Sequence, residues 1–123
     1  MQQGIHLSNV TRGTVLATDL RIAEGPWQRI RGLLGRRGLN PGEGLMIPRC
    51  RSVHMWGMRF AIDVIFVDTS YHVVWQRHRL APGKVSPFIW GAWGCVELPE
   101  GTLEASRTQV GDRLKVDPPT PIS

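Results

Sequence analysis

The sequence predicts an α+β domain that is predominantly β. We expect a compact, barrel-like sheet, antiparallel or mixed, of about six to eight short strands. Fourteen glycines and nine prolines in 123 residues require many turns, which favours short strands over a helical bundle. A hydrophobic content of 41% and this length suffice for one core. We therefore expect a single domain over residues 1–117 and a flexible tail over residues 118–123.

The N-terminal part predicts two strands and the main helix. Residues 5–9 and 14–18 alternate in polarity and flank a turn at Arg12-Gly13, so they are expected to form a strand pair. The helix is expected over residues 26–35, because Pro26 suits a first helical turn. Its apolar side chains fall on one face at helical spacing: Trp27, Ile30, Leu33 and Leu34.

The middle of the chain predicts the centre of the sheet. Residues 45–47 form a short buried strand ended by Pro48, and residues 52–55 are expected to be extended. Residues 62–67 are apolar on both faces apart from Asp63, which is typical of a central strand covered on both sides. Residues 71–75 follow a turn and are expected to complete a hairpin.

The C-terminal part predicts a long loop and the closing elements. The loop covers residues 86–94 and is followed by a strand over residues 95–98. A short helix is expected over residues 100–107, with Leu103 pointing inward. Residues 114–116 are the last predicted strand.

Several segments together resemble the DUF192 (UPF0127) family of small, uncharacterised bacterial and archaeal domains. They cover most of the chain from residue 21 to 116: Arg31–Arg36 (RGLLGR), Gly42–Leu45 (GEGL), Cys50–His54 (CRSVH), Gly57–Asp68 (GMRFAIDVIFVD), Val96–Thr102 (VELPEGT) and Gly111–Leu114 (GDRL). Ala61 stands where the family pattern usually has proline. The resemblance implies a compact, largely β, barrel-like domain with one or two helices, and it implies no activity.

Asp63 is the most informative candidate site residue. It faces the same side of strand 62–67 as Ile65 and Val67, so its carboxylate is expected to enter an apolar environment. A buried ionised carboxylate must be paired or hydrogen-bonded, or take up a proton. The expected partners are three side chains: Arg59, His54 and Arg31. Two roles stay open, namely a structural pair or cap on loop amides, and a general base or ligand contact.

Cys50 and His54 suggest a thiol nucleophile activated by an imidazole. Four residues along a straight strand separate side chains by about 13 Å, at ~3.3 Å per residue, so contact would need a bend. The favoured alternative is a small buried thiol and a hydrogen-bonded histidine. The catalytic residues are therefore unassigned, with Asp63, His54 and Cys50 as the candidates.

Soft donors suited to Cu(I) also stand close together in this part of the chain: Cys50, His54, Met55 and Met58. Met55 would point away from the others on an extended strand, and thioethers more often fill a core. The sequence has no Cys-x-x-Cys or His-x-x-x-His spacing for zinc. We therefore expect no metal site, and we expect no cofactor.

The tryptophans offer a possible binding surface. Four of the five lie near glycines or arginines: Trp56, Trp75, Trp90 and Trp93. Aromatic rings interleaved with arginine suit single-stranded nucleic acid or sugar rings. The alternative is that they plug the open ends of a small barrel.

The charge and the termini bear on partners and location. A net charge of +5 suits nucleic acid, acidic partners or an anionic membrane, but the arginines are scattered, so nucleic acid is possible and not favoured. We find no signal-peptide pattern and no apolar run near the ~20 residues of a spanning helix, so we expect a soluble cytoplasmic protein without a membrane partner. In a reducing compartment Cys50 and Cys95 should stay thiols.

Three hypotheses for the function follow. The favoured one is a small binding or accessory protein, with a pocket for a polar ligand between residues 54–63 and 86–94. The ligand-binding residues would be Arg59, Asp63, His54, Trp56, Met58 and Trp93. The second is a hydrolase- or transferase-type enzyme that uses Asp63 and His54 as acid and base. The third is single-stranded nucleic-acid binding through arginine and tryptophan. A protein partner stays possible, and the oligomeric state is not predicted.

Overall fold

The computed structural model describes residues 4–23 and 37–118, and this part of the chain forms one seven-stranded sheet with one short helix. The strands are β1 (Ile5–Asn9), β2 (Thr14–Ile22), β3 (Glu43–Pro48), β4 (Ile62–Val67), β5 (Val73–Leu80), β6 (Gly94–Pro99) and β7 (Leu114–Asp117), and the helix is α2 (Thr102–Ser106). Their order in the sheet is β5-β4-β6-β3-β2-β1-β7. The prediction of a predominantly β fold is confirmed.

The sheet is mixed because one pair of neighbours is parallel. β2 and β3 run in the same direction, with Asp19 opposite Glu43, while the other neighbouring pairs are antiparallel. A parallel pair needs a long connection between its strands. Here that connection includes residues 24–36, which lie outside the described part.

The sheet curls into a half-barrel whose outermost strands meet at one end. β5 and β7 are last in the strand order, yet His72 forms an isolated antiparallel bridge with Arg113 just before them. The amide of Val73 donates to the carbonyl of Asp112, and the amide of Leu114 donates to the carbonyl of Tyr71; both distances are 2.8 Å. Backbone groups that would otherwise be left unpaired at two sheet edges are thus satisfied by each other.

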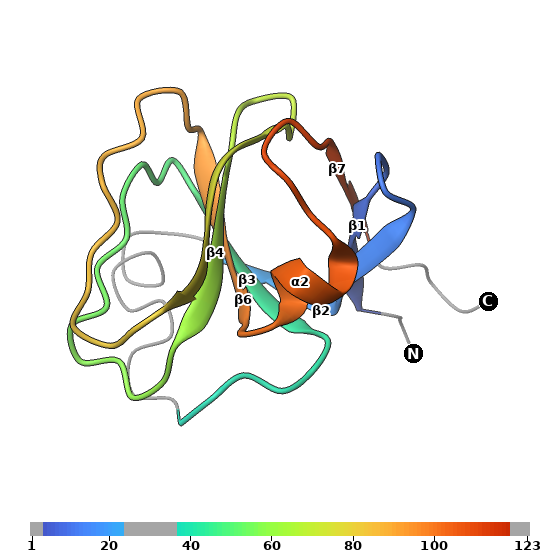
Figure 1. Ribbon diagram of the computed structural model, residues 1–123. Coiled ribbons are helices and arrows are strands. Elements are labelled where there is room, and N and C mark those ends of the chain that lie inside the picture. The colour runs from blue at the N-terminus through green and yellow to red at the C-terminus, as the bar shows by residue number, and fades with distance from the viewer. Residues whose placement is uncertain (1–3, 24–36, 119–123) are drawn as a thin grey trace.

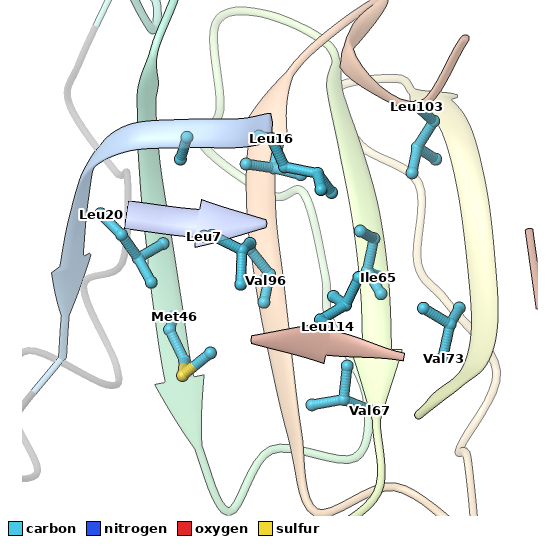
Figure 2. Packing of buried hydrophobic residues seen from close by; sticks show 12 residues of the cluster. Leu7, Leu16, Leu20, Met46, Ile65, Val67, Val73, Val96, Leu103 and Leu114 are labelled. Carbon is cyan, nitrogen blue, oxygen red and sulfur yellow. The ribbon is translucent and has the colours of Figure 1, made fainter. Parts of the chain in front are cut away.

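The concave side of the sheet holds the main core. Figure 2 shows β1 and β7 crossing over β3, β6 and β4, with the buried side chains between them. The labelled members of this core are Leu7, Leu16, Leu20, Met46, Ile65, Val67, Val73, Val96, Leu103 and Leu114. Burial of these side chains removes apolar surface from water and so stabilises the fold.

A second core lies on the opposite side of the same strands. It contains Ile62, Val64 and Phe66 of β4, and Met55 from a loop packs against them. All six residues of β4 are buried, because the strand is covered on both faces. This confirms the prediction for residues 62–67.

Of the two predicted helices, only the short one falls within the described residues. The short helix predicted over residues 100–107 is present as α2, with Leu103 buried as expected. The main helix predicted over residues 26–35 falls outside the described residues, as does most of the predicted tail. In the described part the structure therefore has one short helix, where the sequence predicted a main helix as well. Within the described residues, no helix is long and apolar enough to cross a membrane.

Candidate functional site

Asp63 is fully buried on β4, as expected, and its carboxylate is held by three backbone amides. Oδ1 accepts a hydrogen bond from the amide of Arg79 at 2.9 Å. Oδ2 accepts from the amides of Gly101 at 3.1 Å and Leu103 at 2.9 Å. The side chain is 0% exposed, so these bonds replace the water that an ionised carboxylate would otherwise need.

The three amides belong to places where the backbone lacks its usual partners. Gly101 and Leu103 lie at the start of α2, where helix amides have no acceptor within the helix and where Gly101 supplies no side-chain cap. Arg79 has a φ of 51°, which is unusual for a non-glycine residue, and β4 and β5 change register beside it. Asp63 thus connects β4, β5 and α2.

The amide contacts of Asp63 agree with one of its two expected roles, a cap on loop amides, whereas the side-chain partners predicted for it were wrong where they can be checked. Arg59 and His54 are both exposed, and neither donates a hydrogen bond to this carboxylate. Arg31 lies outside the described residues. The acid–base contact between Asp63 and His54 that an enzyme mechanism would use is not formed, since both carboxylate oxygens accept from backbone amides and the His54 ring lies against Trp56.

Residues 50–60 and 83–93 run side by side and are called the paired loop below. Figure 1 shows both segments on the side of the molecule opposite the two termini. Backbone hydrogen bonds join them: Met55 to Lys84 at 2.7 Å, Ser86 to Val53 at 2.7 Å and Ile89 to Arg51 at 2.7 Å. The two segments predicted to flank a pocket therefore form one hydrogen-bonded unit.

Side chains of the paired loop alternate between inside and outside. Val53 and Met55 are buried in the second core, while His54 and Trp56 between and beyond them are exposed. His54 forms a β-bridge with Val85 of the other segment, and its ring lies 5.5 Å from that of Trp56. The predicted extended conformation over residues 52–55 agrees with this arrangement.

Four large apolar side chains of the paired loop are exposed to solvent, and we call them the outer aromatic face. They are Trp56, Val85, Phe88 and Trp90. Trp90 is 83% exposed and Trp56 is 67% exposed, which is high for the largest apolar residue type. The rings of Phe88 and Trp90 pack edge to face with their centroids 4.7 Å apart. An exposed pair of rings in contact, such as Phe88 and Trp90, marks a binding surface more often than a single exposed apolar residue does.

The charge around this face has one sign. Residues 49–62 and 81–96 contain no aspartate or glutamate, and their cations are Arg49, Arg51, Arg59 and Lys84. All four are exposed. Arg51 is partly fixed, because its Nε donates to the carbonyl of Ala92 at 3.1 Å. An anion at this surface would meet only favourable charges within the paired loop.

A second cluster, the thiol–carboxylate cluster, lies beneath the paired loop and consists of Cys50, Cys95 and Glu97. Cys50 follows β3, and its amide bonds to the carbonyl of Trp93 at 3.2 Å, which brings it beside the start of β6. Its thiol donates to the carbonyl of Ser52 at 3.1 Å and is hydrogen-bonded to the Cys95 thiol. Cys95 and Glu97 are two residues apart on β6 and so share one face of that strand.

The cluster shifts the titration of its members. The hydrogen bond with Cys50 raises the pKa of Cys95 most, and burial adds to it. Burial, and then the neighbouring Cys50, raises the pKa of Glu97 from 4.5 to about 7. Sequence reasoning missed Glu97. The signal was a lone carboxylate between the apolar residues of a buried strand, in the same alternating row as a cysteine.

The residues predicted to bind a ligand do not form one group. Asp63 faces the main core, and Trp93 packs against that core with its ring 6.0 Å from that of Tyr71. Met58 packs against the second core instead. His54, Trp56 and Arg59 are exposed. Within residues 4–23 and 37–118, no three His, Cys, Asp or Glu side chains are grouped so that they could hold a metal ion.

The fold defines a small, predominantly β domain with a curled sheet. The DUF192 family model, described as "Uncharacterized ACR", matches residues 7–116. The chain therefore belongs to the DUF192 family, as the resemblance implied. Nothing in that description assigns an activity.

Individual relatives agree with this assignment. The chain is 31% identical over 112 residues to a UPF0127 protein of Thermococcus sibiricus, covering 88% of this chain and 72% of that protein. It is 32% identical over 117 residues to a UPF0127 protein of Pyrococcus furiosus, and the match covers 87% of this chain and 94% of that protein.

Two solved structures share the fold. A protein of unknown function from Novosphingobium aromaticivorans superposes with a TM-score of 0.76 at 19% identity, covering 90% of this chain and 82% of that one. A protein of Sinorhizobium meliloti, named as a candidate transcription regulator, superposes with a TM-score of 0.74 at 23% identity, covering 94% of each chain. At these identities the likeness concerns the fold alone.

Proposed function

We propose that this chain is a small binding domain that recognises an anionic ligand carrying a flat, apolar group. The observation that carries the proposal is the outer aromatic face, where Trp56 and Trp90 are largely exposed within a loop that has three lysine or arginine side chains and no carboxylate. The hydrogen bonds across the paired loop support it, since they hold the face in one conformation before a ligand arrives.

The chemistry of the two side-chain types matches such a ligand. Tryptophan offers a large rigid surface for stacking on a planar group, and its burial by the ligand removes apolar area from water. Arginine donates several hydrogen bonds in a plane and suits carboxylate or phosphate. Arg59 is the cation that we assign to the anion, because its sequence position places it in the same segment as Trp56.

The proposal assigns different roles to the residues predicted from the sequence. His54, Trp56, Met58 and Arg59 would contact or flank the ligand. Asp63 would act indirectly, because its three amide contacts fix the strand that leads out of the paired loop. Trp93 would support the loop from below, where its amide bonds to the carbonyl of Val67 at 2.7 Å.

A thermal-shift screen with nucleoside monophosphates and aromatic carboxylates tests the proposal. We expect at least one of these probes to raise the unfolding midpoint, and we expect the double variant Trp56→Ala/Trp90→Ala to weaken its binding tenfold or more. Stacking contributes about 1–3 kcal/mol per ring, and each ~1.4 kcal/mol is a factor of ten. Val110→Ala is the matched control, because Val110 is an exposed apolar residue outside the paired loop.

The outcomes separate this proposal from its competitor, single-stranded nucleic acid. The same face of exposed tryptophans and cations supports that second candidate function. It predicts that a short oligothymidylate binds far more tightly than a monophosphate, with affinity that falls steeply as salt is added. If no probe binds the wild type, or if the double variant binds equally well, the outer aromatic face is not a ligand site.

A further inference from the structure

The thiol–carboxylate cluster lies beneath the paired loop and takes no part in the binding proposed above. Neither cysteine forms a disulfide, so both side chains are thiols. Cys50 is half-buried, whereas Cys95 is fully buried, so a reagent from solution meets Cys50 first. Cys50 packs against the second core, which contains Cys95, and its amide bonds to the carbonyl of Trp93 two residues before Cys95, so the two side chains lie beside each other.

From this geometry we infer that Cys50 and Cys95 form a thiol–disulfide exchange site for low-molecular-weight disulfides, with Glu97 as the proton acceptor. Cys50 is the attacking thiol because it is the accessible one. Cys95 is the resolving thiol because it lies next to Cys50 and out of reach of a bulky reagent. This inference is independent of the outer aromatic face and does not need the proposed ligand.

The first step forms a mixed disulfide. The Cys50 thiol gives its proton to Glu97, and the thiolate attacks one sulfur of a disulfide RSSR. A bond forms between Cys50 Sγ and that sulfur, the S–S bond of the reagent breaks, and the thiolate RS⁻ leaves. RS⁻ takes the proton from Glu97 and departs as RSH.

The second step closes the internal disulfide. The Cys95 thiol gives its proton to Glu97, and its thiolate attacks the Cys50 sulfur of the mixed disulfide. The second RS⁻ leaves and is protonated by Glu97. Two electrons have then passed from the two cysteines to RSSR, which has become two molecules of RSH. Excess thiol reverses both steps.

The position of Glu97 explains how buried thiols can react at neutral pH. Glu97 is 5% exposed, and its charge acts on both thiols of the cluster. A thiolate next to a charged carboxylate would place two negative charges in an apolar site. Proton transfer from thiol to carboxylate leaves one negative charge there throughout. The raised pKa of Glu97, about 7, means that both of its protonation states are populated near neutrality.

Oxidised glutathione is the probe for this inference. We expect the folded wild-type chain to lose both thiols and to end as a monomer that is lighter by two hydrogen atoms, with peptide mapping linking Cys50 to Cys95. Cys95→Ser should stop at one glutathione adduct on Cys50. Cys50→Ser should react at least tenfold more slowly than wild type, because its remaining thiol is buried.

Glu97→Gln tests the proton acceptor and retains the shape of the side chain. We expect the mixed disulfide to accumulate and the closing step to slow about tenfold or more at neutral pH, within the range typical of general-base catalysis. The rate at which the mixed disulfide closes in Glu97→Gln should rise steadily with hydroxide concentration. The wild-type rate should instead show an inflection near neutral pH, where Glu97 titrates. Circular dichroism confirms that each variant is folded before it is tested.

Three results would overturn the inference. One is a wild-type adduct on Cys50 that never closes. Another is a wild-type chain whose thiols survive oxidised glutathione until denaturant is added, since the disulfide would then form only from unfolded chains. The third concerns Glu97 alone: closure at an unchanged rate in Glu97→Gln would remove its role.

Discussion

At the scale of single residues, two buried carboxylates on neighbouring strands have opposite surroundings. Asp63 accepts three amide hydrogen bonds, whereas burial and the neighbouring Cys50 raise the pKa of Glu97. Backbone amides stabilise the ionised form of a carboxyl group, and an apolar cover stabilises the neutral form. The two residues therefore contribute to the fold through different interactions.

Glu97 should make the protein less stable as the pH rises through neutrality. Its pKa is 4.5 without the fold and about 7 within it, so the folded state holds the proton more tightly. Stability is unaffected below pH 4.5, falls between pH 4.5 and about 7, and is level above that range. The total loss is about 3 kcal/mol at ~1.4 kcal/mol per pKa unit.

Urea unfolding of wild type and Glu97→Gln at about pH 5 and about pH 8 checks this dependence. We expect the difference in unfolding free energy between the two proteins to change with pH in favour of the variant. Comparing the two chains cancels the titration of the four histidines, which both retain. An equal pH dependence in both chains would show that Glu97 ionises normally in the folded state.

The sequence predicted that Asp63 is buried and offered a cap on loop amides as one of two roles, but it could not identify which amides, for a physical reason. A charged residue within an apolar strand must be buried together with hydrogen-bonding or charged partners, so the strand pattern predicts that Asp63 has partners. The partners are backbone amides that lie 16, 38 and 40 residues further along the chain. Every residue except proline has such an amide, so no side-chain pattern reveals which ones are used.

At the scale of elements, Asp63 fixes the relation between β4, β5 and α2. The change Asp63→Asn leaves one carbonyl oxygen and introduces an NH₂ group that faces backbone donors. We expect a loss of about 2–4 kcal/mol in unfolding free energy, because buried donors lose a charged acceptor. Urea unfolding near neutral pH measures it, with Asp117→Asn as the control.

The control has a small expected effect because Asp117 forms a surface ion pair. Its Oδ1 lies 3.4 Å from Nζ of Lys115, and both side chains are about half exposed or more. Such pairs contribute about 0–1 kcal/mol. If Asp63→Asn were no more destabilising than Asp117→Asn, the three amide contacts would not be important for stability.

The strands themselves were partly predictable. β4 was expected correctly because a run of apolar residues covered on both sides has few alternatives. β5 extends to Leu80, beyond the predicted residues 71–75, because its second half is a run of polar residues that lacks the alternation of a half-buried strand. The parallel pairing of β2 with β3 depends on the tertiary fold, and local patterns do not contain it.

At the scale of the whole molecule, a buried polar network connects the N-terminal hairpin to the turn before β7. Oδ2 of Asp112 accepts from Asn9 Nδ2 at 3.0 Å, Arg12 Nε at 2.9 Å and the amide of Gln109 at 2.9 Å. Burial acts to raise the pKa of Asp112, but these hydrogen bonds outweigh it and lower that pKa below 3.8. The network joins residues about a hundred positions apart in the sequence.

We expect Asp112→Asn to lower the unfolding free energy near neutral pH by about 1–3 kcal/mol, as for other hydrogen bonds to a charged group. A lowered pKa stabilises the fold above pH 3.8, and that contribution is lost as the pH falls through the folded-state pKa. The wild type and variant should therefore converge in acid, which urea unfolding at several pH values measures. Arg12→Gln should have a smaller effect, because that side chain is 40% exposed. A difference between wild type and Asp112→Asn that persists in acid would contradict this explanation.

The sequence predicted that the fold is barrel-like, but it did not predict which strands close the sheet. Turn-rich composition indicated a barrel-like fold, but the contact between His72 and Arg113 that joins β5 to β7 is a tertiary event. The candidate site shows the same limit. The sequence grouped the candidate residues into two loop segments, and the separation of their side chains onto two sides of the sheet depends on strand register.

The paired loop has a consequence for how this family can diverge. Its two segments are joined by main-chain bonds, which any residue except proline can donate, while its outward side chains make few contacts within the domain. Evolution can therefore exchange those outward residues while retaining the scaffold. We expect homologues to keep the backbone path of this region and to differ in the chemistry they display there, so that one architecture serves unrelated molecular recognition tasks.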